Sequence, residues 1–296
     1  MNCEVHFLTK KEFVPILETN PNISKFYSIE KRISEVSKKL KKENYDFVVD
    51  LHHNLRSAQV KTALKKSSSS FSKLNIKKWL IVNFKVNNLP DVHIVDRYFE
   101  TVKSLGIKND LKGLDYFIPK IDEVDLKNLP AVFQNGYIGF VIGAKFATKQ
   151  MPSEKIISII KKINQPIILL GGDDDFEKGE TIKSQSNSNK IFNACGKYNL
   201  NQSASLVKQA KKIITHDTGL MHIASAFKKD VISAWGNTIP EFGMYPYLPG
   251  KNSKIIEVKN LICRPCSKLG YDTCPKGHFK CMNEINEEEI ISQTML

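Results

Sequence analysis

The chain has 296 residues, of which 41% are hydrophobic and 25% charged, a composition typical of a globular protein with two domains of about 150 residues. Apolar runs fall short of the roughly 18 residues of a membrane-spanning helix, and early charges exclude a signal peptide, so we expect a cytoplasmic protein. The formal net charge is +13, and the stretch from Leu51 to Pro90 holds eight lysines and arginines without one Asp or Glu. This basic stretch predicts contact with nucleic acid, anionic lipid or a phosphorylated substrate, or else a solvated basic face.

The first half of the chain alternates short β-rich runs with longer amphipathic ones, the pattern of parallel sheets built from βαβ units. We predict strands at Val5–Leu8 and Phe47–Leu51 in one sheet, with a basic amphipathic helix from about Glu30 to Lys42 between them. The serine-rich segment Lys65–Lys73 predicts a mobile polar loop that could face a substrate, and Val95–Leu105 predicts a second helix.

The acidic, proline-containing segment Ile118–Pro130 resembles a linker, and beyond it a second doubly wound domain begins at about Gly136. The sequence therefore predicts an α/β fold with an N-terminal domain over 1–130 and a C-terminal domain over 131–296 that ends in a cysteine-rich tail. The predicted elements of the second domain are strand Ile138–Ile142, helix Ser153–Ile163, strand Ile167–Leu170, helix Phe176–Ser184, a strand near Ile191, helix Gln202–Lys211, strand Ile213–Thr215, helix Leu220–Phe227 and strand Val231–Trp235.

The most informative segment is THDTGLMHIASAF, residues 215–227, in which a buried strand ends and a helix begins after the DTG tripeptide. Free backbone N–H groups and the helix dipole make such a junction suited to a diphosphate. The ordinary alternative is that Asp217 or Thr218 caps the helix while His222 packs beneath it. A second polar loop, GNT at 236–238, follows the next strand at the same sheet edge and favours a binding site.

Further motifs accompany this segment in a consistent order along nearly the whole chain. They are DLHHNLRSA at 50–58, HIVDRYF at 93–99, GAKFATKQMP at 143–152, LLGG at 169–172 and GKYNL at 196–200, together with Asp217, Thr218, Gly219, His222, Ala224 and Ala226. The set resembles glycosyltransferase family 9, the ADP-heptose:lipopolysaccharide heptosyltransferases. In that family the nucleotide domain carries a D-T-G-x-x-H-x-A-A-like turn and a G-x-T-x-P loop.

The resemblance implies a GT-B architecture, in which two Rossmann-like domains face each other across a cleft, with the donor in the C-terminal half and the acceptor in the N-terminal half. It implies an inverting glycosyltransferase that moves a heptose or related sugar from a donor such as ADP-heptose to a lipopolysaccharide core acceptor, without a metal or other cofactor. Such transfer needs a base for the acceptor hydroxyl and stabilisation of the departing diphosphate. The alternative is a catalytically inactive relative that binds the nucleotide sugar.

On the donor side, the resemblance gives the leaving-group role to backbone amides at the start of the DTG helix and to the positive charge of Lys149, the candidate catalytic residue. Lys145 is a second candidate, and Lys149 could instead be simple surface charge. Asp173, Asp174, Asp175 and Glu177 compete to hold the ribose. The predicted donor-binding residues are Asp217, Thr218, Gly219, Leu220, His222, Gly172, Glu177 and Thr238.

On the acceptor side, Asn54, Arg56 and Arg97 could bind anionic groups of a lipid-linked sugar, although Arg56 could equally pair with Asp50 or another acid. A lipid-linked acceptor implies peripheral contact with the inner face of the cytoplasmic membrane. Nucleic acid is not an expected partner, because the basic residues lack aromatic interleaving and a known recognition motif.

Four cysteines, Cys263, Cys266, Cys274 and Cys281, lie near the C-terminus. A C-x-x-C pair followed by further thiols resembles a structural zinc site, but the spacing is not that of two zinc knuckles. We therefore predict reduced structural cysteines and no metal, with zinc as the alternative.

Members of the family open with a strand, a loop that contains a G-D dipeptide, and a helix, and the aspartate of that loop is regarded as the base. The first residues here, CEVHFLTKKEF, resemble instead the family's second strand and the following helix. The N-terminal domain is thus predicted to be incomplete, with exposed strand edges, unless the start codon is wrongly assigned. The catalytic base stays open, and His52 or His53 is the nearest substitute.

Overall fold

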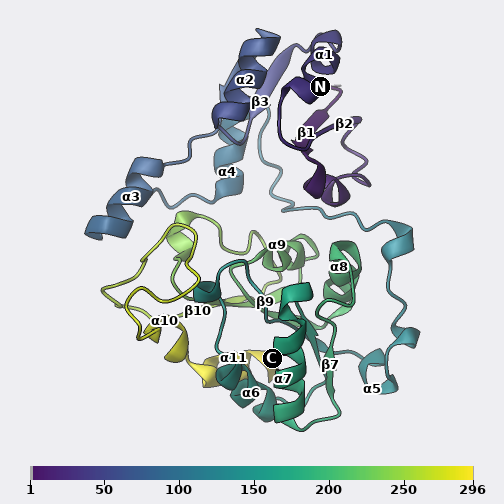
Figure 1. Ribbon diagram of the computed structural model, residues 1–296, viewed down its shortest axis with the longest axis vertical. Coiled ribbons are helices and arrows are strands. Elements are labelled where there is room, and N and C mark those ends of the chain that lie inside the picture. The colour runs from purple at the N-terminus through teal and green to yellow at the C-terminus, as the bar shows by residue number, and fades with distance from the viewer. Residues whose placement is uncertain (1–2, 296) are drawn as a thin grey trace. The chain divides into compact units, whose positions relative to one another are not determined.

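The computed structural model describes residues 3–295, and its internal contacts divide the chain into two compact units (Figure 1). The smaller unit comprises Met1–Leu74 and Val92–Asp110, and the larger unit comprises Asn75–Asp91 and Leu111–Leu296. The chain thus crosses between the units more than once. The predicted division into domains at residue 130 stays a prediction.

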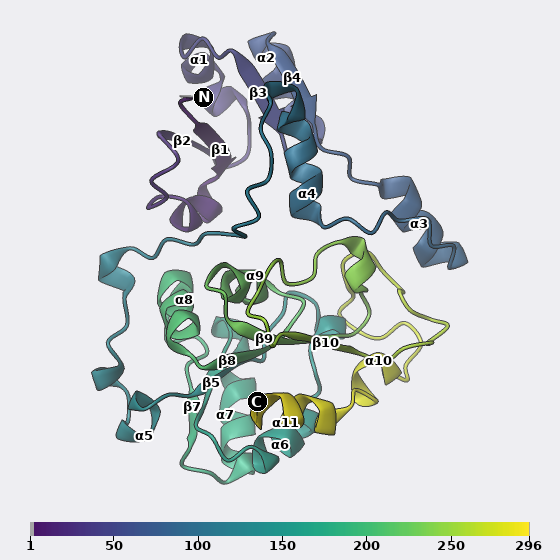
Figure 2. The ribbon, with the colours of Figure 1, turned by 180° about the vertical axis from the view of Figure 1, so that it is seen from behind.

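The larger unit is built on a sheet whose described strands are all parallel, in the order β10-β9-β8-β5-β6-β7 (Figure 2). This arrangement confirms the predicted α/β architecture with a parallel sheet. The strands are β5 (Ile138–Val141), β6 (Ile167–Leu170), β7 (Ile191–Asn193), β8 (Lys212–His216), β9 (Asp230–Trp235) and β10 (Lys254–Glu257). All but β10 were predicted from the sequence.

Helices cover both faces of this sheet, because side chains of successive strand residues point to opposite faces. Ile138 and Phe140 of β5 belong to a core with α6 and α11, whereas Val141 belongs to a core with α8 and α9. The helices of this unit are α3 (Asn75–Phe84), α5 (Ala131–Gln134), α6 (Ser153–Lys162), α7 (Phe176–Ser186), α8 (Leu200–Gln209), α9 (Gly219–Ala226), α10 (Lys280–Asn283) and α11 (Glu287–Met295), with 3-10 turns η3 (Lys120–Asp122), η4 (Leu126–Asn128), η5 (Ala147–Lys149), η6 (Asp173–Asp175) and η7 (Pro240–Phe242).

The predicted linker Ile118–Pro130 is a packed part of the larger unit. Ile118, Val124 and Leu126 contact the core that α8 and α9 share, and the Val124 N–H donates to Ser205 Oγ at 2.9 Å. Burial of these apolar side chains holds the acidic segment against α8.

The smaller unit contains two separate pairs of parallel strands among its described residues, β1 (His6–Lys10) with β2 (Lys25–Ile29), and β3 (Phe47–Asp50) with β4 (Ser67–Ser70). The prediction that the strands at Val5–Leu8 and Phe47–Leu51 share one sheet is therefore wrong. The accompanying helices are α1 (Ser34–Lys42), α2 (Leu55–Leu64) and α4 (Ile94–Phe99), with 3-10 turns η1 (Lys11–Ile16) and η2 (Glu100–Leu105).

The segment Lys65–Lys73, predicted to be a mobile loop, instead contains strand β4. The serine backbone pairs with β3, and beyond the pairing the Phe71 N–H donates to the Asp50 carbonyl at 2.8 Å. The Phe71 side chain is buried. Strand pairing and this one buried ring hold the segment, although four consecutive serines have little intrinsic preference for a strand.

Within the part of the chain that the structure describes, we find no helix both long enough and apolar enough to cross a lipid bilayer.

Candidate functional site

The candidate donor site lies in the larger unit, where three neighbouring strands end. Strand β8 runs between β5 and β9, so the loops after these three strands leave the same edge of the sheet side by side. Ligands of open parallel sheets bind at the carboxyl ends of strands. Lys149, Asp217 and Thr238, all predicted site residues, follow β5, β8 and β9 respectively.

These three side chains meet at one carboxylate, and we call them the Asp217 cluster. Lys149 Nζ lies 2.5 Å from Asp217 Oδ2, and the Thr238 hydroxyl donates to the same oxygen at 2.9 Å. The Lys149 and Asp217 side chains are only 16% and 10% exposed. The alternative that Lys149 is simple surface charge does not fit this buried ion pair, because the pair fixes the position of the ammonium group.

The start of helix α9, next to the cluster, is open. In the described chain, the side chain of Thr218 makes no capping hydrogen bond, although its backbone is extended as at a helix N-cap. Asp217 is engaged by Lys149 and Thr238. Gly219 is exposed, and a Cβ placed on it would meet no heavy atom of the described residues within 4 Å. The first amides of α9 are therefore placed where an anion can reach them.

His222 lies one turn into α9, and the charges of Asp217 and Lys149 both affect the pKa of its imidazole. Burial lowers the pKa of its imidazole, the charge of Asp217 opposes that shift, and the charge of Lys149 adds to it. The imidazole is therefore neutral near pH 7 and can exchange hydrogen bonds without adding charge. Leu220, the other predicted residue of this turn, packs against the sheet core, which leaves only its backbone amide for a ligand.

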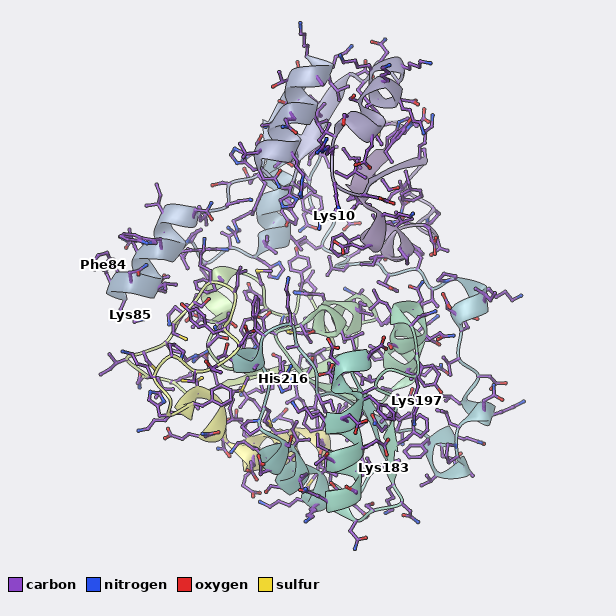
Figure 3. The ribbon with its side chains drawn as sticks, in the orientation of Figure 1. Lys10, Phe84, Lys85, Lys183, Lys197 and His216 are labelled. Atoms are coloured by element: carbon purple, nitrogen blue, oxygen red, sulfur yellow. The ribbon has the colours of Figure 1, made fainter. Side chains whose placement is uncertain are left out.

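His216, the last residue of β8, was missed from the sequence. Its side chain is fully buried in the larger unit (Figure 3), and its Nε2 accepts a hydrogen bond from the Met151 N–H at 3.0 Å. Burial lowers the pKa of His216 to about 3, with the charge of Lys178 as a further cause. A neutral ring is needed here, since Nε2 must accept the hydrogen bond.

Lys178 of α7, also missed, fixes the loop that carries Lys149. Its ammonium donates to the Ile142 carbonyl at 3.2 Å and to Gln150 Oε1 at 2.9 Å. Burial lowers the pKa of Lys178, while the charge of Asp175 opposes that shift. A buried cation thus holds both ends of the loop at the carboxyl edge of the sheet.

The cysteine-rich segment donates hydrogen bonds to the loops that carry Lys149 and Thr238. Arg264 donates to the carbonyls of Gly236 and Thr238 and forms an ion pair with Glu257 at 2.8 Å. Thr148, beside Lys149, receives a hydrogen bond from the Tyr271 N–H at 2.8 Å. The sequence offered only one signal for Arg264, an arginine between two cysteines, and that segment drew attention for its thiols alone.

The cysteines themselves are all free thiols in residues 3–295. Burial raises the pKa of Cys281 to about 12 and also raises the pKa of Cys266, so both stay protonated at neutral pH. Across the described residues, no group of three or more His, Cys, Asp or Glu side chains is arranged to hold a metal ion.

Among the acidic candidates for the ribose, Asp175 already has a structural partner. Its carboxylate accepts a hydrogen bond from the Gly172 N–H at 2.9 Å, and it fills the space beside Gly143, where a Cβ would lie 1.9 Å from Asp175 Oδ2. Asp173, Asp174 and Glu177 are exposed at the same sheet edge and keep their carboxylates available.

The predicted acceptor residues Asn54, Arg56 and Arg97 all belong to the smaller unit, and their surroundings differ. Asn54 caps α2, since its side chain accepts from the Ser57 N–H at 3.0 Å. Arg97 is buried with its guanidinium 5.4 Å from the ring centre of Phe71, whereas Arg56 is exposed.

The suggested pairing of Arg56 with Asp50 is replaced by another. Asp50 forms an ion pair with Lys61 at 2.8 Å and accepts hydrogen bonds from the backbone N–H groups of His52 and His53. Burial alone would raise the pKa of Asp50, but these hydrogen bonds outweigh it and lower the pKa to about 2. The His53 ring in turn contacts the Phe71 carbonyl at 2.9 Å.

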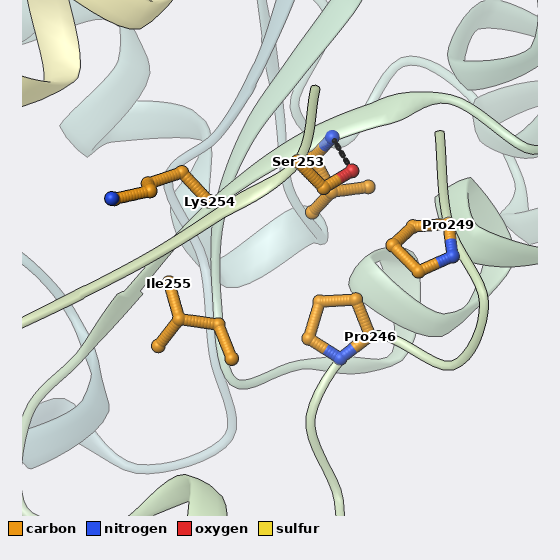
Figure 4. Close-up of a pocket in the computed structure, with 6 residues that line it drawn as sticks. Pro246, Pro249, Ser253, Lys254 and Ile255 are labelled. Carbon is orange, nitrogen blue, oxygen red and sulfur yellow. Dashed lines mark hydrogen bonds between the residues drawn. The ribbon is translucent and has the colours of Figure 1, made fainter. Parts of the chain in front are cut away.

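A small pocket in the larger unit lies away from the Asp217 cluster (Figure 4). It encloses about 120 Å³ beside the first residues of β9 and β10, where the Val231 N–H donates to Ser253 Oγ at 2.8 Å. Because the strands are parallel, this pocket is at the opposite edge of the sheet from the strand ends that carry the cluster.

Comparison with known proteins decides the family. A sequence model described as glycosyltransferase family 9 (heptosyltransferase) matches residues 33–273, which is more than half of the chain. The chain belongs to glycosyltransferase family 9. This confirms both the family and the class of enzyme, a glycosyltransferase, predicted from the motifs.

Two family 9 relatives are lipooligosaccharide heptosyltransferases 2. The protein of Haemophilus influenzae is 24% identical over 96% of this chain and 91% of its own length. The protein of Campylobacter jejuni is 26% identical over 71% of this chain and 65% of its own length, so the chain spans slightly less than two thirds of that relative.

A solved structure extends the likeness to the fold. The Escherichia coli ADP-heptose lps heptosyltransferase II matches with a TM-score of 0.73 at 19% identity, over 99% of this chain and 88% of that chain. This match, with the parallel sheet of the larger unit, confirms the predicted GT-B fold class.

Proposed function

We propose that the chain transfers a heptose, or a related sugar, from a nucleotide diphosphate donor such as ADP-heptose to an acceptor in the core of lipopolysaccharide. The observation that carries this proposal is the Asp217 cluster beside the open start of α9. A fixed ammonium group and helix amides together suit a diphosphate. The names of the family 9 relatives, all heptosyltransferases, support the choice of sugar.

In this proposal the acceptor hydroxyl oxygen attacks the anomeric carbon, and the bond from that carbon to the donor diphosphate breaks with inversion. The electron pair of the broken bond goes to the diphosphate, and the hydroxyl proton goes to a base. Lys149 stabilises the negative charge on the diphosphate, because Asp217 occupies only one of its three N–H donors. The amides of Thr218, Gly219 and Leu220 add to this stabilisation.

Asp217 and Thr238 serve in this scheme as positioning residues. They orient the ammonium group of Lys149 before the donor arrives, so little reorganisation is needed during transfer. Gly172 and Glu177 lie at the neighbouring strand end, after β6, where an exposed carboxylate can reach the ribose hydroxyls.

We further propose that the acceptor is lipid-linked and anionic, and that the chain meets it in peripheral contact with the inner face of the cytoplasmic membrane. Arg56 is the best placed of the predicted acceptor residues, since it is exposed, while Asn54 caps a helix and Arg97 is buried. A guanidinium suits phosphate groups of a lipopolysaccharide core.

The test is transfer by the full chain from ADP-heptose to a lipopolysaccharide core acceptor that lacks the added heptose, with ADP-glucose as the control donor. We expect one ADP released for each acceptor molecule that gains the mass of one heptose, and a product of inverted anomeric configuration by NMR. ADP binding by calorimetry without any product would favour the inactive donor-binding relative. Failure to bind ADP at all would contradict both functions.

A further inference from the structure

Helix α3 presents an exposed apolar surface that the proposed chemistry does not use. Three large side chains of this ten-residue helix are exposed, Ile76 at 76%, Trp79 at 52% and Phe84 at 62%. The Trp79 and Phe84 rings lie edge to face with centroids 5.3 Å apart. We call Ile76, Trp79 and Phe84 the α3 surface, and Figure 3 marks its outer end at Phe84.

The opposite side of α3 is fixed to the larger unit. Ile81 is buried in a small core with Ile239 and Phe242, the residues that follow the Thr238 loop. At the end of the helix, Lys85 Nζ donates to the Pro265 carbonyl at 2.7 Å and to the Cys263 carbonyl at 3.3 Å. The α3 surface is therefore presented by an anchored helix, and its exposure is not that of a loose segment.

Helix α3 also carries positive charge and no acidic residue. Between Leu51 and Pro90 the sequence contains eight lysines and arginines and no Asp or Glu, and one of these lysines, Lys77, is an exposed residue of α3. The segment that Lys85 holds adds a further apolar side chain, Ile262, which is 89% exposed. Scattered exposed apolar residues are ordinary, but three on one helix within a basic stretch form a patch.

We propose that the α3 surface docks on an anionic lipid bilayer, with the rings of Trp79 and Phe84 at the level of the headgroups and Lys77 against their phosphates. Tryptophan beside lysine is the composition that favours the membrane interface, where the ring has an apolar body and the ammonium stays in water. Anionic lipid attracts such lysines.

The same charges argue against a second copy of this chain as the occupant. Two α3 surfaces that met face to face would bring their lysines together, and like charges across an interface cost binding energy. Membrane docking by α3 rests on the proposed function, because a lipid-linked acceptor has to be reached at a bilayer. Binding to a bilayer can nevertheless be measured without sugar transfer.

The test is sedimentation of the full chain with vesicles of phosphatidylcholine alone or mixed with phosphatidylglycerol. We expect binding to the anionic vesicles only, weakened at high salt, and at least tenfold weaker for Trp79→Ser/Phe84→Ser, roughly the loss expected for two exposed rings. The matched control is Leu111→Ser/Ile121→Ser, whose side chains are 71% and 90% exposed elsewhere in the larger unit. The control should bind as the unchanged chain does.

Tryptophan fluorescence gives a second readout, because the chain has two tryptophans and Trp235 is buried in the core. Anionic vesicles should shift the emission of Trp79 to shorter wavelength, and Trp79→Phe should abolish the shift while vesicle binding persists. Equal binding by Trp79→Ser/Phe84→Ser and the unchanged chain would overturn the proposal. So would a dimer in the absence of lipid that this variant dissociates.

Transfer to a deacylated, water-soluble core acceptor separates the two proposals. The variant Trp79→Ser/Phe84→Ser should keep its rate on that acceptor and lose rate only on acceptor embedded in vesicles. A loss on the soluble acceptor would place α3 in acceptor recognition and overturn the membrane role. If the unchanged chain transfers nothing but still binds anionic vesicles through α3, the proposed function fails and the docking surface stands.

Discussion

Both compact units contain parallel β-strands and helices, but they differ in how far the strands are buried and joined into one sheet. In the larger unit every residue of β5 and β6 is buried, and helices lie on both faces of the sheet. In the smaller unit the described strands form two separate pairs, and β3 buries only Asp50. Polar contacts are prominent there, such as the ion pairs Lys61–Asp50 and Lys25–Glu43.

A preorganised site needs strand ends that are held in place. A continuous buried sheet fixes its strand ends, and the Asp217 cluster uses three adjacent ends at once. Short strand pairs are marginal on their own, and a partly exposed ion pair such as Lys25–Glu43 contributes little stability. We therefore expect the larger unit to hold the donor rigidly and the smaller unit to depend more on local contacts.

The largest expected effect is on stability, and it compares one leucine in each unit. Leu169→Ala, in β6 with its side chain fully buried, should lower the free energy of unfolding by about 2–5 kcal/mol, because it removes apolar contacts and leaves a cavity. Leu51→Ala, at a side chain 37% exposed just after β3, should lower it by less than about 1 kcal/mol. Urea unfolding monitored by circular dichroism measures both.

Fluorescence of Trp235 reports unfolding of the larger unit, since this side chain lies in its core. It therefore shows whether the larger unit is the one that a substitution destabilises. Equal losses of unfolding free energy for Leu51→Ala and Leu169→Ala would contradict the proposed difference between the two units.

The next effect is on catalysis. Lys149→Ala should lower kcat by about 10²–10³-fold, the cost of removing one preorganised group that in our proposal stabilises the departing diphosphate. Arg56→Ala in the smaller unit should raise the KM for the acceptor with little change in kcat, because an exposed side chain contributes to binding alone. Initial rates at varied donor and acceptor concentrations separate the two cases.

The outcome that would contradict this prediction is an unchanged kcat for Lys149→Ala in a folded protein. Asp217→Asn is the matched control, since it keeps the side-chain shape and removes the charge that orients Lys149. It should lower kcat by a smaller factor than Lys149→Ala does.

The two units should also lose stability in different pH ranges. The pKa of His216 falls from 6.5 to about 3 on burial, so the unfolded chain binds more protons between these values. Stability from this group is present above pH 6.5 and is lost as the pH falls towards 3, by at most about 1.4 kcal/mol per pH unit. The pKa of Asp50 falls from 3.8 to about 2, so its contribution in the smaller unit is lost only between these values.

His216→Gln tests this assignment, because the glutamine carbonyl can still accept the Met151 N–H without taking up a proton. The variant should show a shallower fall in unfolding free energy between about pH 6.5 and pH 5 than the unchanged chain. Burial also lowers the pKa of His222, so part of the slope should remain. Identical slopes would contradict the assignment to His216.

The sequence was a good guide where local patterns decide the structure. Apolar runs placed β5, β6, β8 and β9, and the DTG turn placed Asp217 at the end of a strand. It could not predict that Lys149 and Asp217 form an ion pair, because 68 residues separate them and only the strand order brings them together.

Elements held by tertiary contacts escaped prediction. Strand β4 consists of four serines and exists through pairing with β3. Arg264 braces the loop carbonyls of Gly236 and Thr238 from a segment without regular structure, where no periodicity points to it. Lys178 of α7 has no sequence motif around it, and the packing of that helix places its ammonium group against the Lys149 loop.

The smallest effect compares the starts of one helix in each unit. Asn54→Ala should cost about 1 kcal/mol of stability, because Asn54 and Ser57 cap α2 reciprocally. Asn54→Asp should keep the stability that Asn54→Ala loses, since its carboxylate accepts the same N–H.

Thr218→Ala, at the start of α9, should change stability by less than about 0.5 kcal/mol, as Thr218 makes no side-chain cap among the described residues. It should also keep ADP binding, because in our proposal the backbone amides of α9 bind the diphosphate. Thermal unfolding and calorimetry with ADP measure these changes. If Asn54→Asp regained stability but not transfer, Asn54 would bind the acceptor as well as cap α2; if Thr218→Ala lost ADP binding, its hydroxyl and not its amide would be the donor contact.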